Sequence, residues 1–144
     1  MSRCVVDASV VVKWYVPENL SDAAARLLAQ ACSGNLRLFA PDLLFAEVGN
    51  VLWKKLRRGE LQPAEAARII KAVTRTFPGR VAQCRPLMPT ALRIASACGR
   101  SVYDSLYIAL AQALGGQLVT ADERLANALE HGPFGATVVY LGSV

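Results

Sequence analysis

The sequence predicts an α/β domain with a mainly parallel central sheet. Short apolar runs alternate along the chain with longer amphipathic segments, which is the pattern of strands joined by helices. The chain has 144 residues, of which 53% are hydrophobic and 19% charged, so it can bury a core and is not a disordered chain. No linker, repeat or low-complexity stretch interrupts the pattern. We therefore expect residues 1–144 to form one domain.

The expected strands are short apolar runs that end at a polar or helix-breaking residue. The first run is rich in β-branched residues and ends at Asp7, and the second is closed by Pro41. In chain order the expected strands are Arg3–Val6, Leu36–Phe39, Val81–Cys84, Gln117–Thr120 and Thr137–Leu141. Ligands of such a sheet bind beyond the carboxyl ends of its strands, so the residues that follow the strands are the first candidates for a site.

The expected helices are bounded by proline and glycine. Pro17 stops the first helix, Pro63 occupies the first turn of a later one, and Gly59 and Gly115 follow two long helices. In chain order the expected helices are Ser9–Tyr15, Ser21–Cys32, Asp42–Arg58, Pro63–Phe77, Thr90–Ala97, Val102–Leu114 and Asp122–Glu130.

Cysteine and histidine usage excludes several chemistries. The 4 cysteines form no C-x-x-C pair and lie among apolar residues, so we expect buried free thiols and no zinc ribbon. The single histidine, His131, cannot support a two-histidine mechanism, and we place it at the surface near a helix C-terminus. Neither a G-x-S-x-G elbow nor a glycine-rich phosphate loop is present.

The net charge is compatible with a nucleic-acid partner. The chain carries 16 Lys and Arg against 11 Asp and Glu, for a formal charge of +5, although a charge of this size also simply keeps a protein soluble. The apolar runs are too short to cross a bilayer, and Asp7 interrupts the first of them, so no signal peptide can be drawn there. We expect a cytoplasmic protein that does not bind membranes.

Two carboxylates directly follow expected strands. Asp7 comes after Val6, and Asp122 comes two residues after Thr120, so both are expected at the carboxyl edge of the sheet. A structural role explains each residue equally well. Asp7 suits an Asx turn or a helix N-cap, and Thr120 with Glu123 suits a capping box beside Asp122.

Two further carboxylates lie on expected helices. Glu47 borders the apolar stripe of its helix and has Val51 rather than a lysine at position i+4, although most glutamates are simply solvated. Asp104 lies near a helix start, where Ser101 and Asp104 can form a capping box. A cluster of all four acids would need a cation, and oxygen ligands without paired Cys or His suit Mg²⁺ or Mn²⁺.

In this order, the segments around the four acids resemble those of the PIN-domain nucleases, most closely the VapC-type toxins of bacterial toxin–antitoxin systems. The four matching segments together cover essentially the whole chain. They are Val5-Val6-Asp7-Ala8-Ser9, Pro41 through Glu47-Val48-x-Asn50-Val51-Leu52, Tyr103-Asp104-Ser105-x-Tyr107-x-Ala109-Leu110-Ala111, and Thr120-Ala121-Asp122-x-x-Leu125.

The resemblance implies a PIN-like α/β/α sandwich and an endoribonuclease that uses Mg²⁺ or Mn²⁺. It places Asp7, Glu47, Asp104 and Asp122 in one acidic pocket as catalytic and metal-binding residues, with Ser9 and Thr120 as polar neighbours. It further implies inhibition by a cognate antitoxin and a homodimer. The chemistry expected of such a site is hydrolysis at phosphorus, which leaves a 5′-phosphate.

Basic residues offer a path for RNA or for a protein partner. Those singled out are Lys54, Arg57, Arg68, Lys71 and Arg75, together with Lys55 and Arg58 at the end of the Glu47 helix. The alternatives are complementarity to a helix dipole and a solvated helix face. The aromatic residues Trp14, Trp53, Tyr103 and Tyr107 could stack on bases, but we expect each in the core.

Two other functions remain open from the sequence. One is a housekeeping PIN nuclease of RNA processing that has no antitoxin, and the other is a PIN-like RNA-binding module that has lost catalysis. The complete set of four acids argues against the second. A receiver domain is excluded, because the chain lacks its acidic pair beside the first strand and its late lysine.

Overall fold

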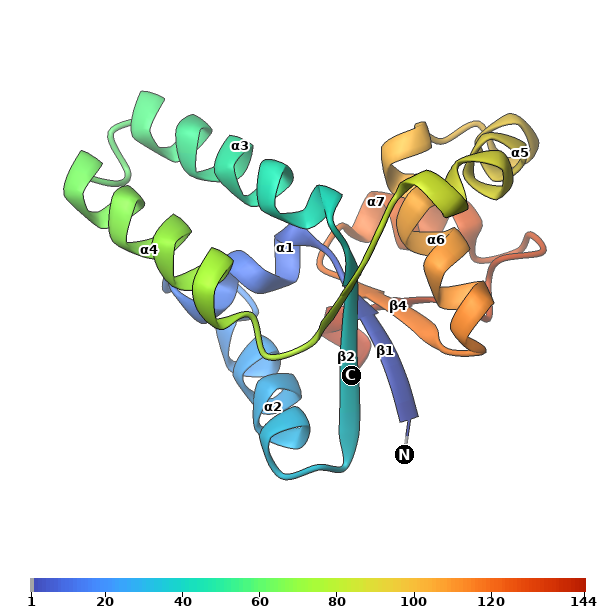
Figure 1. Ribbon diagram of the computed structural model, residues 1–144, viewed down its shortest axis with the longest axis horizontal. Coiled ribbons are helices and arrows are strands. Elements are labelled where there is room, and N and C mark those ends of the chain that lie inside the picture. The colour runs from blue at the N-terminus through green and yellow to red at the C-terminus, as the bar shows by residue number, and fades with distance from the viewer. Residues whose placement is uncertain (1) are drawn as a thin grey trace.

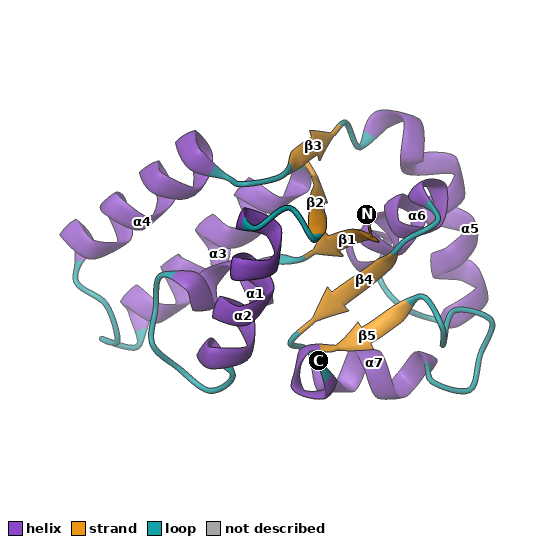
Figure 2. Cartoon of the chain, turned by 90° about the horizontal axis from the view of Figure 1, so that it is seen from below, coloured by secondary structure: helices purple, strands orange, loops and turns teal. Residues whose placement is uncertain are grey.

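The computed structural model describes residues 2–144, which form a five-stranded, all-parallel sheet with helices on both faces. The strand order is β3-β2-β1-β4-β5, as Figure 2 shows. The strands are β1 (Ser2–Val6), β2 (Leu36–Pro41), β3 (Arg80–Ala82), β4 (Gln117–Thr120) and β5 (Val138–Tyr140). In the central register, Val5 of β1 pairs with Phe39 of β2 and with Leu118 of β4. The predicted α/β class with a parallel sheet is confirmed.

Seven α-helices connect or follow these strands in the described part of the chain. They are α1 (Ala8–Val11), α2 (Ser21–Cys32), α3 (Leu43–Arg57), α4 (Pro63–Thr76), α5 (Met88–Cys98), α6 (Val102–Leu114) and α7 (Glu123–Leu129). Their bounds follow the predicted ones to within two residues, except that α1 gives way to a 3₁₀ turn over Val12–Trp14. Short 3₁₀ turns also precede α5 and follow β5.

The two faces of the sheet bury separate apolar clusters. Successive strand residues point to opposite faces, so Val6 packs with the cluster of α1 to α4, whereas Val5 packs with that of α5 to α7. Figure 1 shows the consequence: α3 and α4 project as one arm, and α5, α6 and α7 gather on the other side of the strands. The fold is therefore layered as helix, sheet and helix.

The chain reverses its direction of travel across the sheet between β1 and β4. Strands β2 and β3 are added in turn on one side of β1, and the chain then crosses back so that β4 pairs with the other side of β1. At such a switch point the connections leave a crevice beyond the carboxyl ends of the two strands. Asp7 follows β1 and Asp122 follows β4, so the topology brings these two acids to that crevice.

Two predictions about local structure need correction. Cys32 is exposed, and Cys84 and Cys98 are only half-buried, because they lie near the ends of helices or strands rather than in the core; all four thiols are free, and Cys4 is buried as expected. The Thr120–Glu123 capping box does not form, since Asp122 itself caps α7. No helix within residues 2–144 is long and apolar enough to span a membrane.

Candidate active site

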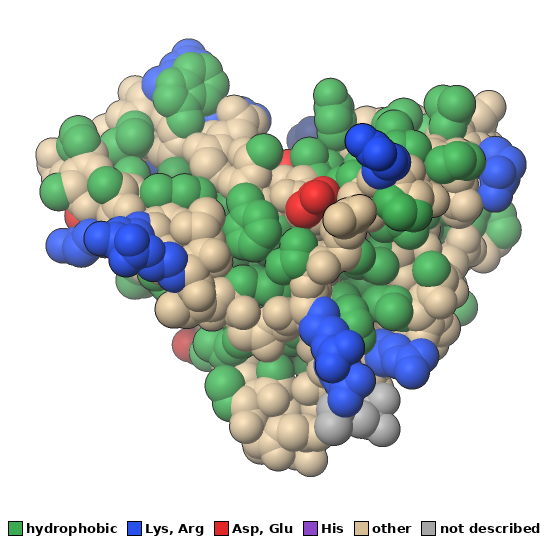
Figure 3. All heavy atoms as spheres, in the orientation of Figure 1, with side chains coloured by type: hydrophobic (Ala, Val, Ile, Leu, Met, Phe, Trp, Pro, Cys, Tyr) green, Lys and Arg blue, Asp and Glu red, His purple; other side chains and the backbone are tan. Residues whose placement is uncertain are grey.

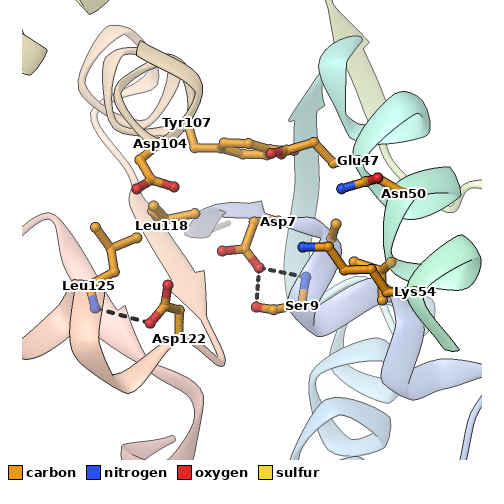
Figure 4. Close-up of a pocket in the computed structure, with 12 residues that line it drawn as sticks. Asp7, Ser9, Glu47, Asn50, Lys54, Asp104, Tyr107, Leu118, Asp122 and Leu125 are labelled. Atoms are coloured by element: carbon orange, nitrogen blue, oxygen red, sulfur yellow. Dashed lines mark hydrogen bonds between the residues drawn. The ribbon is translucent and has the colours of Figure 1, made fainter. Parts of the chain in front are cut away.

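The four predicted acids line one cavity of about 220 Å³ at the carboxyl edge of the sheet. Each comes from a different part of the fold: the end of β1, the middle of α3, the first turn of α6 and the residue before α7. Figure 4 shows these side chains facing a common space. The remaining lining residues are Ala8, Ser9, Asn50, Val51, Lys54, Tyr107, Leu118 and Leu125.

Asp7 is held by the start of α1. Its Oδ1 accepts hydrogen bonds from the backbone N–H of Ser9 at 3.1 Å and from that of Val10 at 3.4 Å, and also from the Ser9 hydroxyl. These bonds satisfy helix N–H groups that have no partner within the helix. Asp7 is thus an N-cap, as the structural alternative proposed, and it also lies in the cavity.

Ser9 and Thr120 join the two central strands below the acids. The Ser9 Oγ accepts a hydrogen bond from the backbone N–H of Ala121 at 2.9 Å and lies 3.5 Å from the Thr120 Oγ1. Thr120 Oγ1 in turn accepts from the backbone N–H of Asp122 at 3.0 Å. This network fixes the backbone that carries Asp122 relative to the backbone that carries Asp7.

Asp122 and Asp104 are both fixed at the starts of helices. Asp122 Oδ1 accepts from the backbone N–H of Leu125 at 3.1 Å, which caps α7. Asp104 lies in the first turn of α6, where its own backbone N–H donates to the Ser101 Oγ at 3.1 Å. Its carboxylate is 3.5 Å from the Nε of Arg100, an ion pair that the sequence analysis missed and that an i, i+4 spacing could have suggested.

Glu47 reaches the cavity from α3. The face of this helix that carries Leu44, Val48 and Leu52 is buried, so Glu47 is left at the border between core and cavity. Asn50 lies one turn further along and also lines the cavity. Across the cavity, the Tyr107 side chain extends from α6 toward Glu47 (Figure 4).

Without a bound cation, burial and mutual repulsion disfavour the ionised form of these carboxylates. Burial raises the pKa of Asp7 from 3.8 to about 6, against the hydrogen bonds from Ser9 and Thr120, and the charge of Glu47 adds to the rise. Burial also raises the pKa of Glu47, and the charge of Asp104 adds to that rise. The pKa of Asp104 is raised in the same way by burial and by the charge of Asp122. A cation bound among these groups would relieve this repulsion.

The family of the chain follows from comparison with known proteins. The model of the PIN domain matches residues 4–129. The chain belongs to the PIN-domain family. The protein named Ribonuclease VapC3 of Pyrobaculum aerophilum is 38% identical over 126 residues, which are 87% of this chain and 93% of that protein. Ribonuclease VapC1 of Mycobacterium tuberculosis is 34% identical over 130 residues, 89% of this chain and 92% of that one.

A solved structure shows the same architecture. The crystal structure of PAE2754 from Pyrobaculum aerophilum superposes with a TM-score of 0.70 at 27% identity, covering 99% of this chain and 85% of that one. The predicted resemblance to the PIN-domain family and its VapC members is thus confirmed.

The cationic side chains of this PIN domain divide into separate groups. Lys54 lines the acidic cavity, whereas Lys55 turns away to the Glu18 carboxylate at 2.7 Å. Arg57 lies over the Trp53 ring at 4.7 Å from its centroid. Arg68, Lys71 and Arg75 are exposed on α4 and do not line the cavity. Figure 3 shows acidic atoms in the notch between the two lobes, with cations spread over the lobes.

Two of the four aromatic predictions need correction. Trp53 is 51% and Tyr103 61% exposed, because each occupies the outward face of its helix rather than the core. Tyr107 is buried as predicted, and it lines the cavity as well. Asn50 and Tyr107 are lining residues that the sequence analysis had not assigned to the site. Their spacing of three residues from Glu47 and from Asp104 is the signal that would have found them.

Proposed function

We propose that this protein is an endoribonuclease that hydrolyses RNA phosphodiester bonds with Mg²⁺ or Mn²⁺, and that it acts as a toxin held in check by a cognate antitoxin. The observation that carries the proposal is the convergence of four carboxylates from four elements on one cavity. Carboxylates gathered at the sheet's switch point destabilise the protein without a cation, which is the pattern of a functional site rather than of a packing device.

The donor set suits a hard divalent cation. Asp7, Glu47, Asp104 and Asp122 supply carboxylate oxygens, and Asn50 adds an amide. Within residues 2–144 no group of three acidic, histidine or cysteine side chains is placed to hold an ion directly. An ion at this cavity would therefore be held through one or two carboxylates and through water, as Mg²⁺ usually is in proteins.

Each acid of the cavity has a proposed role in the hydrolysis. A bound divalent ion would supply charge that activates water and stabilises the pentavalent phosphorus transition state. Asp7, Asp104 and Asp122 would hold that ion directly or through water. Glu47 would hold it as well, or orient the attacking water in line with the leaving 3′-oxygen, so that the product carries a 5′-phosphate.

The names of relatives support the choice of substrate. Two proteins that are similar to this chain over most of its length are both named ribonucleases of the VapC type. A toxin of this type needs an antitoxin. The basic residues of α3 and α4 form a charged surface that either the antitoxin or the RNA could bind. We further propose a homodimer formed by this single domain.

Two alternatives make different predictions. A housekeeping PIN nuclease would have the same cavity but no gene for a DNA-binding antitoxin directly upstream, and its expression alone would not arrest growth. A catalytically silent RNA-binding module would bind RNA but leave it intact with any metal. Expression with and without the neighbouring gene, followed by mapping of RNA ends, separates the three functions.

The direct test uses the purified protein freed of any partner. We expect it to cleave RNA with Mg²⁺ or Mn²⁺, to leave 5′-phosphate ends, and to lose activity in excess EDTA. Zn²⁺ should be a poor substitute, because it prefers nitrogen and sulfur ligands in tetrahedral sites. Asp122→Asn serves as the inactive control. Undiminished cleavage in EDTA would contradict the proposed metal chemistry.

A further inference from the structure

The hydroxyl of Tyr107 is a buried polar group that packing alone does not explain. Tyr107 is only 2% exposed, yet its Oη has no hydrogen-bond partner among residues 2–144. Arg100 Nε and Ser105 Oγ are also buried without a hydrogen-bond partner. Neither of these residues lines the acidic cavity, whereas Tyr107 does. A buried, unpartnered hydroxyl costs stability compared with the phenylalanine of the same shape. Its presence therefore calls for a role beyond packing.

The position of Tyr107 links two lobes of the protein. Tyr107 lies one helical turn after Asp104 on α6, so both side chains leave the same face of that helix. Its side chain extends across the cavity toward Glu47 on α3, as Figure 4 shows. Among residues 2–144, Tyr107 is the hydrogen-bonding side chain whose proximity lowers the pKa of Glu47.

The protonation state of Tyr107 limits what it can do. A tyrosine phenol ordinarily has a pKa of about 10 and so keeps its proton at neutral pH. The hydroxyl can therefore act as a donor but not as a base. A donor aimed at a carboxylate restricts the orientation of that carboxylate and leaves its second oxygen free for another ligand.

We propose that Tyr107 is a positioning residue, whose O–H donates a hydrogen bond to the Glu47 carboxylate and fixes that carboxylate opposite Asp104. The role rests on the proposed nuclease function, in which Glu47 serves the ion or the attacking water. It follows the general requirement that a group in direct contact with a metal be held by a second group behind it. Tyr107 would thereby join the α3 and α6 sides of the cavity across the notch.

The first test is Tyr107→Phe, which removes the hydroxyl and keeps the ring. With a single-stranded RNA that the wild-type protein cleaves, we expect kcat to fall about tenfold, by the size of a hydrogen bond to a charged group, with KM changed less than twofold. The Tm of the metal-free protein should fall only slightly, since one hydrogen bond to a carboxylate is lost while the packing of the ring is kept. Tyr140→Phe on β5, outside the cavity, is the matched control and should leave kcat unchanged. An unchanged kcat in Tyr107→Phe overturns the proposal.

The second test is a double-mutant cycle read by Mn²⁺ titration without RNA. We expect Tyr107→Phe to weaken Mn²⁺ binding severalfold in the wild-type background and by less than twofold in the Glu47→Gln background, because the hydroxyl acts through Glu47. Equal weakening in both backgrounds overturns the positioning role, and this holds even if the variant is less stable. If the wild-type protein binds Mn²⁺ but cleaves no RNA, the proposed function fails while the cycle still decides the role of Tyr107.

Discussion

Single residues of this protein serve the fold and the cavity at the same time. Asp7 caps α1 through Ser9 and Val10 while its carboxylate faces the other acids. Asp122 caps α7 in the same way. The structural and functional explanations of these residues are therefore compatible, because a carboxylate has four lone-pair sites and a cap uses only part of them. The caps fix the carboxylates before any ligand arrives, which lowers the cost of binding one.

Asp7→Asn should separate the two roles. Asparagine keeps the oxygen that caps α1 but removes the charge, so we expect cleavage to be abolished and the metal-free protein to be stabilised at pH 7. Because the pKa of Asp7 rises from 3.8 to about 6 on folding, the stabilisation is at most about 3 kcal/mol. A large fall in Tm would instead show that the charge of Asp7 is needed for the turn.

The same substitution predicts a pH dependence. A raised carboxyl pKa means that the folded protein binds the proton more tightly than the unfolded chain does. The penalty from Asp7 is therefore present above pH 6 and disappears as the pH falls toward 4. In denaturant titrations without metal, the stability difference between Asp7→Asn and the wild-type protein should shrink over this range. A constant difference would contradict the raised pKa.

The set of four acids could be predicted from the sequence because the segments that carry them resemble, in order, those of the PIN-domain nucleases. Local pattern alone marks Asp7, Asp122 and Glu47 as candidates, and a structural role explains each of them as well. Tyr107 could not be assigned in this way, because an aromatic residue within an apolar helix looks like core from its neighbours alone. Only the tertiary arrangement, which sets α6 opposite α3, shows that its side chain extends toward Glu47.

At the scale of elements, helix α3 carries one acid of the cavity and two neighbouring lysines that point to different places. Glu47 and Lys54 face the cavity, whereas Lys55 pairs with Glu18 in the loop before α2. Glu18 also binds Lys13, at 3.2 Å, in the 3₁₀ turn that follows α1. This three-residue cluster ties the segment after Asp7 to the helix that carries Glu47, so it sets the spacing between two acids of the cavity.

Glu18→Gln should weaken the ion pairs that Glu18 forms with Lys13 and Lys55. The Lys13 and Lys55 side chains are only 12% and 14% exposed. Loss of the carboxylate leaves Lys13 without its acidic partner and leaves Lys55 with only the more distant Glu60 carboxylate, at 3.9 Å. We expect a loss of about 1–3 kcal/mol in the free energy of unfolding. Chemical denaturation at pH 7 measures it, with the exposed Glu130→Gln as the control. A loss equal to that of the control would show that the cluster contributes nothing.

The pH dependence of the Glu18 cluster should have the opposite sign to that of Asp7. Burial opposes ionisation of Glu18, but the hydrogen bonds from Lys55 and Lys13 outweigh it and lower the pKa of this carboxyl. The stabilisation is therefore complete above the ordinary Glu pKa of 4.5 and is lost as the pH falls below it. The difference between wild-type and Glu18→Gln stability should vanish in acid.

Lys54→Gln tests the cation inside the cavity. Lys54 forms no ion pair with any acid of residues 2–144, which leaves its ammonium free for a phosphate of the substrate. We expect kcat/KM for RNA to fall about tenfold and its salt dependence to weaken by roughly one phosphate contact. Mn²⁺ affinity should hold or rise, since a like charge is removed. Arg26→Gln on α2 is the control, and a loss of Mn²⁺ affinity in Lys54→Gln would indicate a structural role instead.

Element boundaries could be predicted where proline or glycine sets them. Helix α4 begins at Pro63 as expected, and α6 ends before Gly115, which has a φ of +63° that suits glycine. The predicted start of α5 at Thr90 is two residues late, because the helix begins at Met88 and Pro89 lies in its first turn. Strand order was not accessible, because it depends on pairings between distant segments.

At the scale of the whole molecule, the cavity is assembled from segments that span most of the chain. A ligand that binds them all should stabilise the entire fold. Mn²⁺ at about 100 times its dissociation constant should add about 2.7 kcal/mol, which corresponds to a rise in Tm of roughly 5–10 °C. EDTA should reverse the rise, and Asp122→Asn should reduce it. A Tm that does not respond to Mn²⁺ would contradict a metal site at the switch point.

The position of β4 between β1 and β5 has a consequence during synthesis. Asp122 is the last of the four acids to be made, and it reaches the cavity only when β4 has paired with β1. A growing chain that ends before β4 has its first three strands and α6 but an incomplete set of acids. A nuclease site of the proposed kind would therefore stay incomplete on the ribosome until β4 has been made and has paired with β1.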